Sequence, residues 1–274
     1  MKAAQFEYVR ASDVANALEL LSERGEGAKV LAGGQSLGPM LNLRLARPQI
    51  LIDIARIEAL RCIEDLGMAW RIGAAVTHSR LEDAALRGAE MLAEVARGIA
   101  HRAVRNRGTI GGSVAHADPA ADWPVALAAI GARARVRSAT GTRTLGVESI
   151  VLGAFTTALA DNEMIESIEV PKLSPTGRWG YYKFSRKVGD FAEVSAAAVF
   201  DPQNGTARLY LGALRGSPLP LAKLAADVAA HGRAAVMRDA VLDALTEVAP
   251  DLDVVERRMA AAVVMRALNQ ALGA

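Results

Sequence analysis

RNRGTIGGSVAHADPAADWP, residues 105–124, is the stretch on which the fold depends. The adjacent glycines Gly111 and Gly112 carry no Cβ, so the backbone can bend until successive N–H groups converge on one anion. Just downstream, Asp118 followed by Pro119 has the form of a helix N-cap with proline at the first helical position. The stretch therefore predicts a phosphate-binding loop, followed by a helix that runs from residue 118 to 130.

A second glycine pair lies about eighty positions upstream, in Ala32-Gly33-Gly34-Gln35-Ser36, directly after the apolar residues Val30 and Leu31. Two such loops favour one extended, doubly charged group such as a pyrophosphate, and hence a dinucleotide. Neither loop has the G-x-G-x-x-G spacing or the Lys-Ser/Thr ending of other nucleotide loops. Each pair taken alone also fits an ordinary tight turn.

Three strings in this order resemble the FAD-binding medium subunit of molybdenum hydroxylases, the carbon monoxide dehydrogenase and xanthine dehydrogenase group. They are AGGQSLGPMLNLRLARPQILIDI at 32–54, VRNRGTIGGSVAHADPAADWP at 104–124 and YYKFSRKVGDFAEVSAAAVF at 181–200. The resemblance covers nearly the whole chain. The main departure is Gln35, where this family often has histidine, and it affects only a side-chain contact.

The resemblance implies an α+β fold. Residues 1–176 would form a PCMH-type FAD-binding domain, with a small β-α-β subdomain over about 1–55 and a larger α/β subdomain over about 56–176. Residues 177–274 would form a C-terminal antiparallel sheet packed with helices, and Leu173 to Gly177 looks like the linker between the two domains.

The resemblance also implies a function: an FAD-binding electron-transfer subunit of a heterotrimeric molybdenum hydroxylase. A large molybdopterin subunit would oxidise the substrate, and a small subunit with [2Fe–2S] clusters would pass electrons to FAD, the whole forming a dimer of heterotrimers. This chain would supply no catalytic residue and no metal ligand. Its expected FAD contacts are Ala32, Gly33, Gly34, Gln35, Ser36, Thr109, Ile110, Gly111, Gly112, Ser113, Asp122, Ile168, Lys183, Lys187 and Phe191.

Composition restricts the class of protein. The 274 residues are 51% hydrophobic and 23% charged, which is typical of a globular chain. A net charge of +2 gives no basic field for nucleic acid or anionic lipid. The single cysteine, Cys62, excludes an internal disulfide and any cluster held by this chain's own thiolates, and we expect it to be inert packing.

The first residues contain no uninterrupted apolar run, and no later segment reaches the roughly 18 to 20 apolar residues of a membrane span. We therefore expect a cytoplasmic protein that is not integral to a membrane. Association with the inner membrane through the complex stays open.

Periodicity predicts the remaining elements. In the first half we expect helices over 13–24, preceded by Ser12, and over 40–46, 80–87 and 89–102, with strands over 28–31 and 50–54 and a hairpin over 61–76. In the second half we expect strands over 132–137, with its arginines in solvent, and over 164–170, 179–185, 195–200 and 207–214, then helices over 220–231, 235–248 and 254–272.

Several side chains have two interpretations. Arg44 is either a phosphate ligand or an exposed arginine, and Asp122 either accepts from a ribose or adenine group or favours the start of its helix. Phe191 is either near the flavin ring or in the core, while Lys183 and Lys187 either face the cofactor or lie in solvent. His78 and His101 lack acidic or thiol companions at ligand spacing, so we expect surface or capping roles.

Three other classes of protein remain open. A self-sufficient flavin oxidase or dehydrogenase would need its own substrate pocket and often carries a covalent flavin link through His or Cys. Neither glycine loop contains such a residue, although His116 lies close to the second loop. A reductase that binds NAD(P) by itself and a non-catalytic binding module are the others. The organic substrate and the final electron acceptor do not follow from the sequence.

Overall fold

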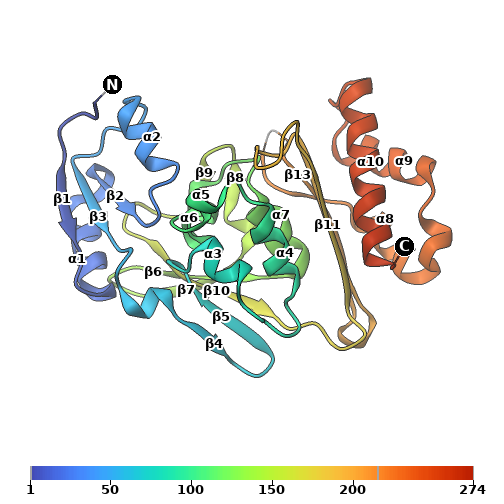
Figure 1. Cartoon of the computed structure of the whole chain (residues 1–274), viewed down its shortest axis with the longest axis horizontal. Helices are drawn as coiled ribbons and strands as arrows, with labels where there is room; N and C mark the ends of the chain where they lie inside the picture. The colour runs from blue at the N-terminus through green and yellow to red at the C-terminus, as the bar shows by residue number, and fades with distance from the viewer. Residues whose placement is uncertain (1, 215, 274) are drawn as a thin grey trace.

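The computed structural model describes residues 2–214 and 216–273. Its three larger sheets follow one another along the long axis of the molecule (Figure 1). The first sheet comes from the N-terminal residues, the second from the middle of the chain and the third from the C-terminal part. A mixed helix and sheet fold is what the sequence predicts. Within the described residues, no helix combines the length and the apolar character that crossing a membrane requires.

The N-terminal sheet is parallel and has the order β1 (Glu7–Arg10), β3 (Ile50–Asp53) and β2 (Ala28–Leu31). Helix α1 (Val14–Arg24) lays its apolar stripe on the sheet, and its N-cap is Asp13 rather than Ser12. A 3-10 turn, Gly25–Gly27, leads from α1 into β2. The prediction missed β1, whose four residues are mostly exposed and carry no apolar run.

Helix α2 (Leu37–Asn42) begins and ends earlier than the predicted helix over 40–46. It ends because Arg44 adopts a left-handed conformation with φ 58°. The guanidinium of Arg44 donates to the carbonyl of Lys2, and its side chain is exposed. Because α2 begins at Leu37, its start lies directly after the first glycine pair and Ser36.

The middle sheet is antiparallel and brings together strands that are distant in the sequence. A 3-10 turn, Glu58–Arg61, precedes it, and its order is β4 (Ile63–Asp65), β5 (Ala69–Gly73), β10 (Met164–Pro171), β6 (Arg133–Arg137) and β7 (Thr142–Gly146). After β7 come the 3-10 turn Val147–Ser149 and the hairpin of β8 (Val151–Gly153) and β9 (Thr156–Thr157).

Of two expectations about side chains near this sheet, one is wrong and one is confirmed. Cys62 is exposed rather than packed, because it lies in the edge connection just before β4. The arginines of β6 lie on the outward face as predicted: the side chains of Arg135 and Arg137 are 41% and 38% exposed, and each also forms an ion pair, 2.6 Å from a carboxylate oxygen of Glu166 on the neighbouring β10.

Helices α3 (His78–Glu82), α4 (Met91–Gly98), α5 (Arg102–Arg105), α6 (Ile110–His116) and α7 (Asp122–Ile130) follow β5. The predicted helix over 89–102 is divided because Ala100 has φ 43°. The predicted helix from residue 118 begins only at Asp122, with Ala121 as N-cap. Asp118 instead accepts a hydrogen bond from the N–H of Ala120, in a turn that separates α6 from α7. Gly131 ends α7 as predicted.

The C-terminal sheet is antiparallel, with the order β11 (Arg178–Phe184), β12 (Val194–Asp201), β13 (Thr206–Gly212) and β14 (Leu219–Pro220), and a 3-10 turn, Pro202–Asn204, joins β12 to β13. The helices that follow are α8 (Ala222–His231), the 3-10 turn Gly232–Ala235, α9 (Arg238–Val248) and α10 (Val254–Ala271). The three predicted helices are confirmed to within three residues at each end.

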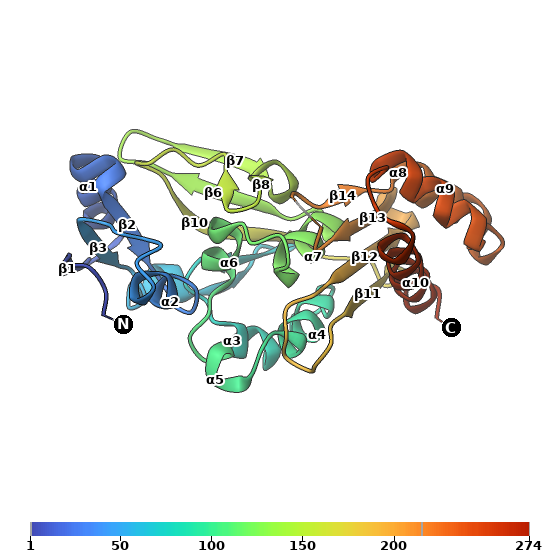
Figure 2. The same ribbon diagram turned by 90° about the horizontal axis from the view of Figure 1, so that it is seen from above.

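Helix α7 covers one face of this sheet, and α8 and α10 cover the other (Figure 2). Strand β12 is buried on both faces, with Ala197 and Val199 in the core shared with α7 and Ala196 and Ala198 in the core of the outer helices. Helix α7 thereby joins the middle and C-terminal sheets into one packed body.

The buried carboxylate of Asp201 anchors the connection between the two sheets. It accepts hydrogen bonds from the N–H and hydroxyl of Ser174, at 2.7 and 2.6 Å, and from the side chain of Asn204 at 2.8 Å. Burial alone would raise the pKa of Asp201, but these hydrogen bonds outweigh it and hold the pKa below its usual value. The domain boundary near residue 176 stays a prediction.

Candidate functional site

A cavity of about 470 Å³ lies where the three parts of the chain meet. The N-terminal sheet contributes the first glycine segment, residues 32–36, to its wall. The middle part contributes the turn before α6 and the first residues of that helix, and the C-terminal sheet contributes residues 189–191, which connect β11 to β12.

The first glycine segment is in direct contact with the second glycine segment, residues 107–113, which holds the turn before α6 and the first residues of that helix. An added Cβ on Gly33 would lie 2.2 Å from the carbonyl oxygen of Arg107 and 2.8 Å from Cα of Gly108. Only a residue without Cβ lets these two backbones approach so closely. The structure thus brings together two segments that the sequence separates widely.

The first segment has free hydrogen-bond donors. Within the described residues, the N–H groups from Gly33 to Leu37 donate to no protein acceptor, and the hydroxyl of Ser36 has no protein partner. Gly34 has φ 70°, which turns the chain, and the amide of Gln35 donates to the carbonyl of Gly33 at 3.0 Å. This row of N–H groups at the cavity can receive an anion with several acceptor oxygens.

The second segment differs from its prediction. Residues 110–113 are the first turn of α6 rather than a loop, and Thr109 is its N-cap, with its hydroxyl oxygen accepting from the N–H of Gly112 at 3.1 Å. The N–H groups of Ile110 and Gly111 donate to carbonyl oxygens of residues 76 and 74, at 3.1 and 3.0 Å. These two N–H groups are therefore not available to a ligand, and their hydrogen bonds hold α6 against the residues that follow β5.

The glycine at position 111 also serves packing. A Cβ there would lie 2.4 Å from Cβ of Ala74, so α6 rests directly on the residue after β5. Ile110 is fully buried in the core and does not line the cavity, whereas Thr109, Gly111, Gly112 and Ser113 do.

Asp122 lies at the first position of α7 and lines the cavity, but its buried carboxylate already has protein partners. It accepts a hydrogen bond from the hydroxyl of Tyr181 at 2.5 Å, and Nζ of Lys183 lies 2.9 Å away in an ion pair without hydrogen-bond alignment. Burial, and then the charge of Asp122, raise the pKa of Tyr181 well above its usual value. The carboxylate thus connects α7 to β11.

The remaining predicted contacts are divided between the cavity and other places. Phe191 lines the cavity and is 63% exposed, so it is not a core residue. Lys187 is exposed and lies outside the cavity wall, and Lys183 is also absent from it. Ile168 is fully buried in β10 and does not reach the cavity.

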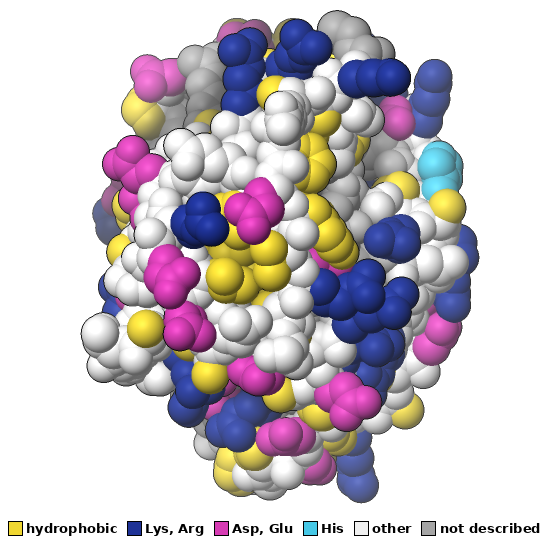
Figure 3. All heavy atoms as spheres, turned by 90° about the vertical axis from the view of Figure 1, so that its left-hand side faces the viewer, with side chains coloured by type: hydrophobic (Ala, Val, Ile, Leu, Met, Phe, Trp, Pro, Cys, Tyr) yellow, Lys and Arg dark blue, Asp and Glu magenta, His cyan; other side chains and the backbone are white. Residues whose placement is uncertain are grey.

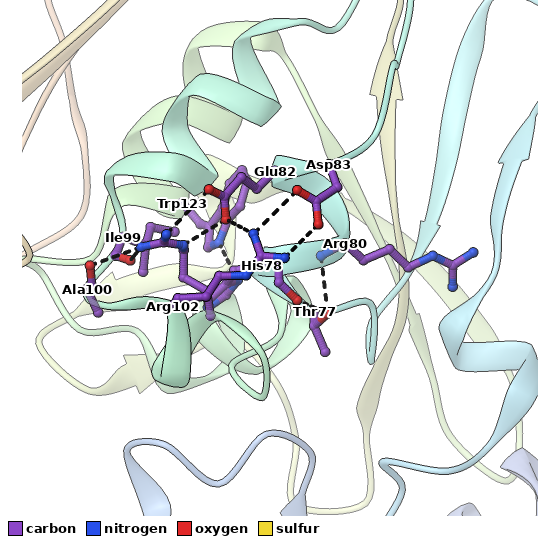
Figure 4. A network of polar contacts seen from close by, with 11 residues as sticks. Thr77, His78, Arg80, Glu82, Asp83, Ile99, Ala100, Arg102 and Trp123 are labelled. Atoms are coloured by element: carbon purple, nitrogen blue, oxygen red, sulfur yellow. Dashed lines mark hydrogen bonds and ion pairs between the residues drawn. The ribbon is translucent and has the colours of Figure 1, made fainter.

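His78 also lines the cavity, and the prediction of a surface or capping role for it was wrong. Its side chain is buried, and its Nδ1 accepts from the indole N–H of Trp123 at 3.1 Å (Figure 4). Burial, and then the charge of Arg105, lower the pKa of His78 to about 4, so the ring is neutral at pH 7. Its Nε2 would lie 2.7 Å from a Cβ at Gly108, which places the ring under the junction of the two glycine segments.

Two further aromatic side chains line the cavity, and of these only His116, beside the second glycine pair, was noted from the sequence. His116 packs against Phe155 with ring centroids 5.1 Å apart, and both line the cavity. Burial lowers the pKa of His116. Phe155 belongs to the β8–β9 hairpin, which the prediction did not contain.

The surface at the N-terminal end is mixed in charge. Figure 3 looks onto this end, where Lys and Arg side chains are interspersed with Asp and Glu around a small group of hydrophobic side chains. Within residues 2–214 and 216–273, no three His, Cys, Asp or Glu side chains gather as a metal site.

Comparison with known proteins identifies the family of this chain. Residues 4–173 match the family described as the FAD binding domain in molybdopterin dehydrogenase. The chain is 39% identical over 220 residues to the 6-hydroxypseudooxynicotine dehydrogenase complex subunit alpha of Paenarthrobacter nicotinovorans, which covers 79% of this chain and 74% of that protein. It is 40% identical over 204 residues to the carbon monoxide dehydrogenase medium chain of Hydrogenophaga pseudoflava, covering 74% and 71%.

Solved structures give the same result over the full length. A chain of carbon monoxide dehydrogenase from Hydrogenophaga pseudoflava, in a form that lacks the Mo-pyranopterin moiety of its cofactor, superposes with a TM-score of 0.92 at 36% identity and covers 100% of this chain and 99% of that one. A chain of quinoline 2-oxidoreductase from Pseudomonas putida 86 gives a TM-score of 0.89 at 29% identity, covering 100% and 99%.

Proposed function

Because the chain belongs to the family of FAD-binding subunits of molybdopterin dehydrogenases, we propose that it seats FAD in the cavity between its two glycine segments and passes electrons from partner [2Fe–2S] clusters to an external acceptor. The chain is the flavoprotein subunit of an oxidoreductase complex. The relatives carry names of complex subunits and medium chains.

One observation carries the assignment of the binding site: the N–H groups from Gly33 to Leu37 line a cavity and donate to no acceptor among residues 2–214 and 216–273. A pyrophosphate offers several anionic oxygens at the spacing of successive peptide groups, and it would satisfy these donors. The hydroxyls of Ser36 and Thr109 can donate to the same group. Of the predicted contacts, we propose that Gly33 to Ser36 donate to the pyrophosphate, together with the N–H of Leu37, and that Thr109, Gly111, Gly112, Ser113 and Phe191 supply contact surface.

Bound FAD supplies electron exchange, and this chain's residues bind it and exclude water from it. The neutral ring of His78 supports the junction of the glycine segments, and Asp122 holds α7 against the C-terminal sheet. Phe191 forms the exposed part of the wall and is our candidate for contact with the flavin ring. None of these side chains has to act as an acid, base or nucleophile on the organic substrate.

We propose the same partners for this chain that the family resemblance implies: a large molybdopterin subunit and a small iron–sulfur subunit, assembled as a dimer of heterotrimers in the cytoplasm. The relatives' names as subunits and medium chains of multi-subunit dehydrogenases support this proposal. Light scattering of the purified complex tests the stoichiometry.

The test of the electron-transfer function is anaerobic mixing of candidate substrate with the flavoprotein, first alone and then with its large and small partners, while flavin absorbance is followed. We expect bleaching only in the assembled complex. Flavin released by denaturation should chromatograph as FAD and not as FMN. Bleaching of the isolated chain by substrate would favour the alternative, a self-sufficient FAD-dependent oxidase or dehydrogenase.

A further inference from the structure

We infer that Arg105, a residue with no assigned role, is a positioning residue that holds the wall formed by residues 189–191 in place beside the cofactor cavity. The inference rests on the proposed function, because it concerns one wall of the FAD site. Arg105 lies in α5, and its side chain is only 12% exposed. It does not itself line the cavity.

The guanidinium of Arg105 joins two separate elements. Its Nη1 donates to the carbonyl oxygens of Ile99 and Ala100, at 3.0 and 3.1 Å. Its Nε and Nη2 donate to the carboxylate of Glu82 in α3, at 2.8 and 3.4 Å. A planar fork of donors can make all these bonds at once, which an ammonium cannot do.

These bonds hold a turn that is unfavourable by itself. Ala100 has φ 43°, in the left-handed region that residues with a Cβ rarely adopt. Such a conformation persists only where the surroundings fix it. Figure 4 shows the carbonyls of Ile99 and Ala100 converging on the network that contains Glu82.

The wall of the cavity rests on this turn. Gly189 has φ 87°, and a Cβ on it would lie 3.0 Å from the carbonyl oxygen of Ala100 and 2.9 Å from Cε1 of His101. Ile99 and Ala100 line the cavity together with residues 189–191. Hydrogen bonds therefore connect Glu82 through Arg105 to Ala100, and Ala100 in turn lies against the loop of residues 189–191 that lines the cofactor cavity.

The neighbouring Arg102 provides a matched control. It pairs with the same carboxylate, 2.9 Å from Glu82, and with Asp83 at 2.8 Å (Figure 4). Its side chain is exposed and, in the part of the chain that the structure describes, donates to no backbone carbonyl. Changing Arg102 perturbs the charge network while leaving the turn at Ala100 bonded.

The experiment compares Arg105→Lys, Arg102→Lys and Gly189→Ala with the wild-type full chain. Two readouts are measured: the Kd for FAD together with the midpoint potential of the bound flavin, and the rate of tryptic cleavage after Arg186 or Lys187, which lie at the start of the loop. Thermal unfolding of each variant shows that the fold is intact.

We expect Arg105→Lys to raise the Kd for FAD by about tenfold, the effect of losing roughly one charge-assisted hydrogen bond. Gly189→Ala should also raise the Kd, because its Cβ would press on the carbonyl oxygen of Ala100 and displace the same wall. Both should shift the midpoint potential in the same direction and accelerate cleavage, and their double variant should be less than additive. Arg102→Lys should match wild type.

Wild-type behaviour of Arg105→Lys in all readouts, or equal effects of Arg105→Lys and Arg102→Lys, would overturn the inference. Failure of the wild-type chain to bind FAD would instead overturn the proposed function, so the two failures are distinguishable. If Arg105→Lys unfolds, Gly189→Ala on the exposed loop still decides the question through the same readouts.

Discussion

Gly33→Ala should disable FAD binding because of the contact between the two glycine segments. The new Cβ would lie 2.2 Å from the carbonyl oxygen of Arg107, and an ordinary contact begins at about 3.4 Å. The segments must separate by about 1.2 Å to restore it. The atoms that the Cβ would meet belong to the backbone of Arg107 and Gly108, so no side chain can rotate away to relieve the contact.

The magnitude follows from the cost of overpacking, which is about 1–3 kcal/mol for an extra carbon in a close-packed place. The apo chain can relieve this strain by moving the segments apart, whereas the bound form requires them together. The cost then falls on binding and corresponds to a rise in Kd of about 5- to 150-fold.

The assay is FAD titration of apo protein followed by flavin fluorescence, with Gly38→Ala as the control. Gly38 lies in α2, and an added Cβ there would have none of the described residues outside its own helix within 4 Å, so alanine should leave the Kd unchanged. Equal Kd values for Gly33→Ala and wild type would refute the reasoning that the close approach of the segments forms the site.

Two further predictions concern buried polar groups. The pKa of His78 is lowered to about 4, so between pH 6.5 and about 4 the unfolded chain binds a proton that the folded chain does not, and the free energy of unfolding should fall by about 3 kcal/mol as the pH falls through this range. In His78→Gln, urea unfolding at several pH values should show a weaker dependence of this free energy on pH. An unchanged dependence would contradict the burial of His78. Asp122→Ala leaves the ammonium of Lys183 buried without its ion pair and should lower the free energy of unfolding by about 3–5 kcal/mol. The double variant with Lys183→Met should lower this free energy by less than the sum of the two single variants. Additive effects would show that the two side chains are not coupled.

Much of the fold could be predicted from the sequence because local patterns decide helices and strands. The apolar stripe of α1, the alternation in β6 and the long helical pattern of α10 each gave an element within a few residues of its true bounds. The errors lie where backbone conformation overrides the pattern. Arg44 and Ala100 adopt positive φ, which residues with a Cβ seldom do, and so end or divide helices that the periodicity continues.

The site was predicted in part. The two glycine pairs indicated a pyrophosphate site, and the resemblance carried by the surrounding strings indicated the family. The sequence did not show that the N–H groups of Ile110 and Gly111 are occupied by carbonyls of residues 74 and 76, because those partners come from a strand end more than thirty residues away. Nor did it show that Ile168 and Lys187 lie off the cavity wall.

The sequence by itself determined the family, the α+β class and the two segments suited to a dinucleotide, because these depend on residue types at fixed spacing along the chain. Only the tertiary structure decided which donors are free, since a hydrogen-bonding group is available to a ligand only when no distant part of the protein already satisfies it. The same holds for His78, whose neutral state depends on burial against Trp123, and for Arg105, whose carbonyl partners take up their positions only in the folded chain.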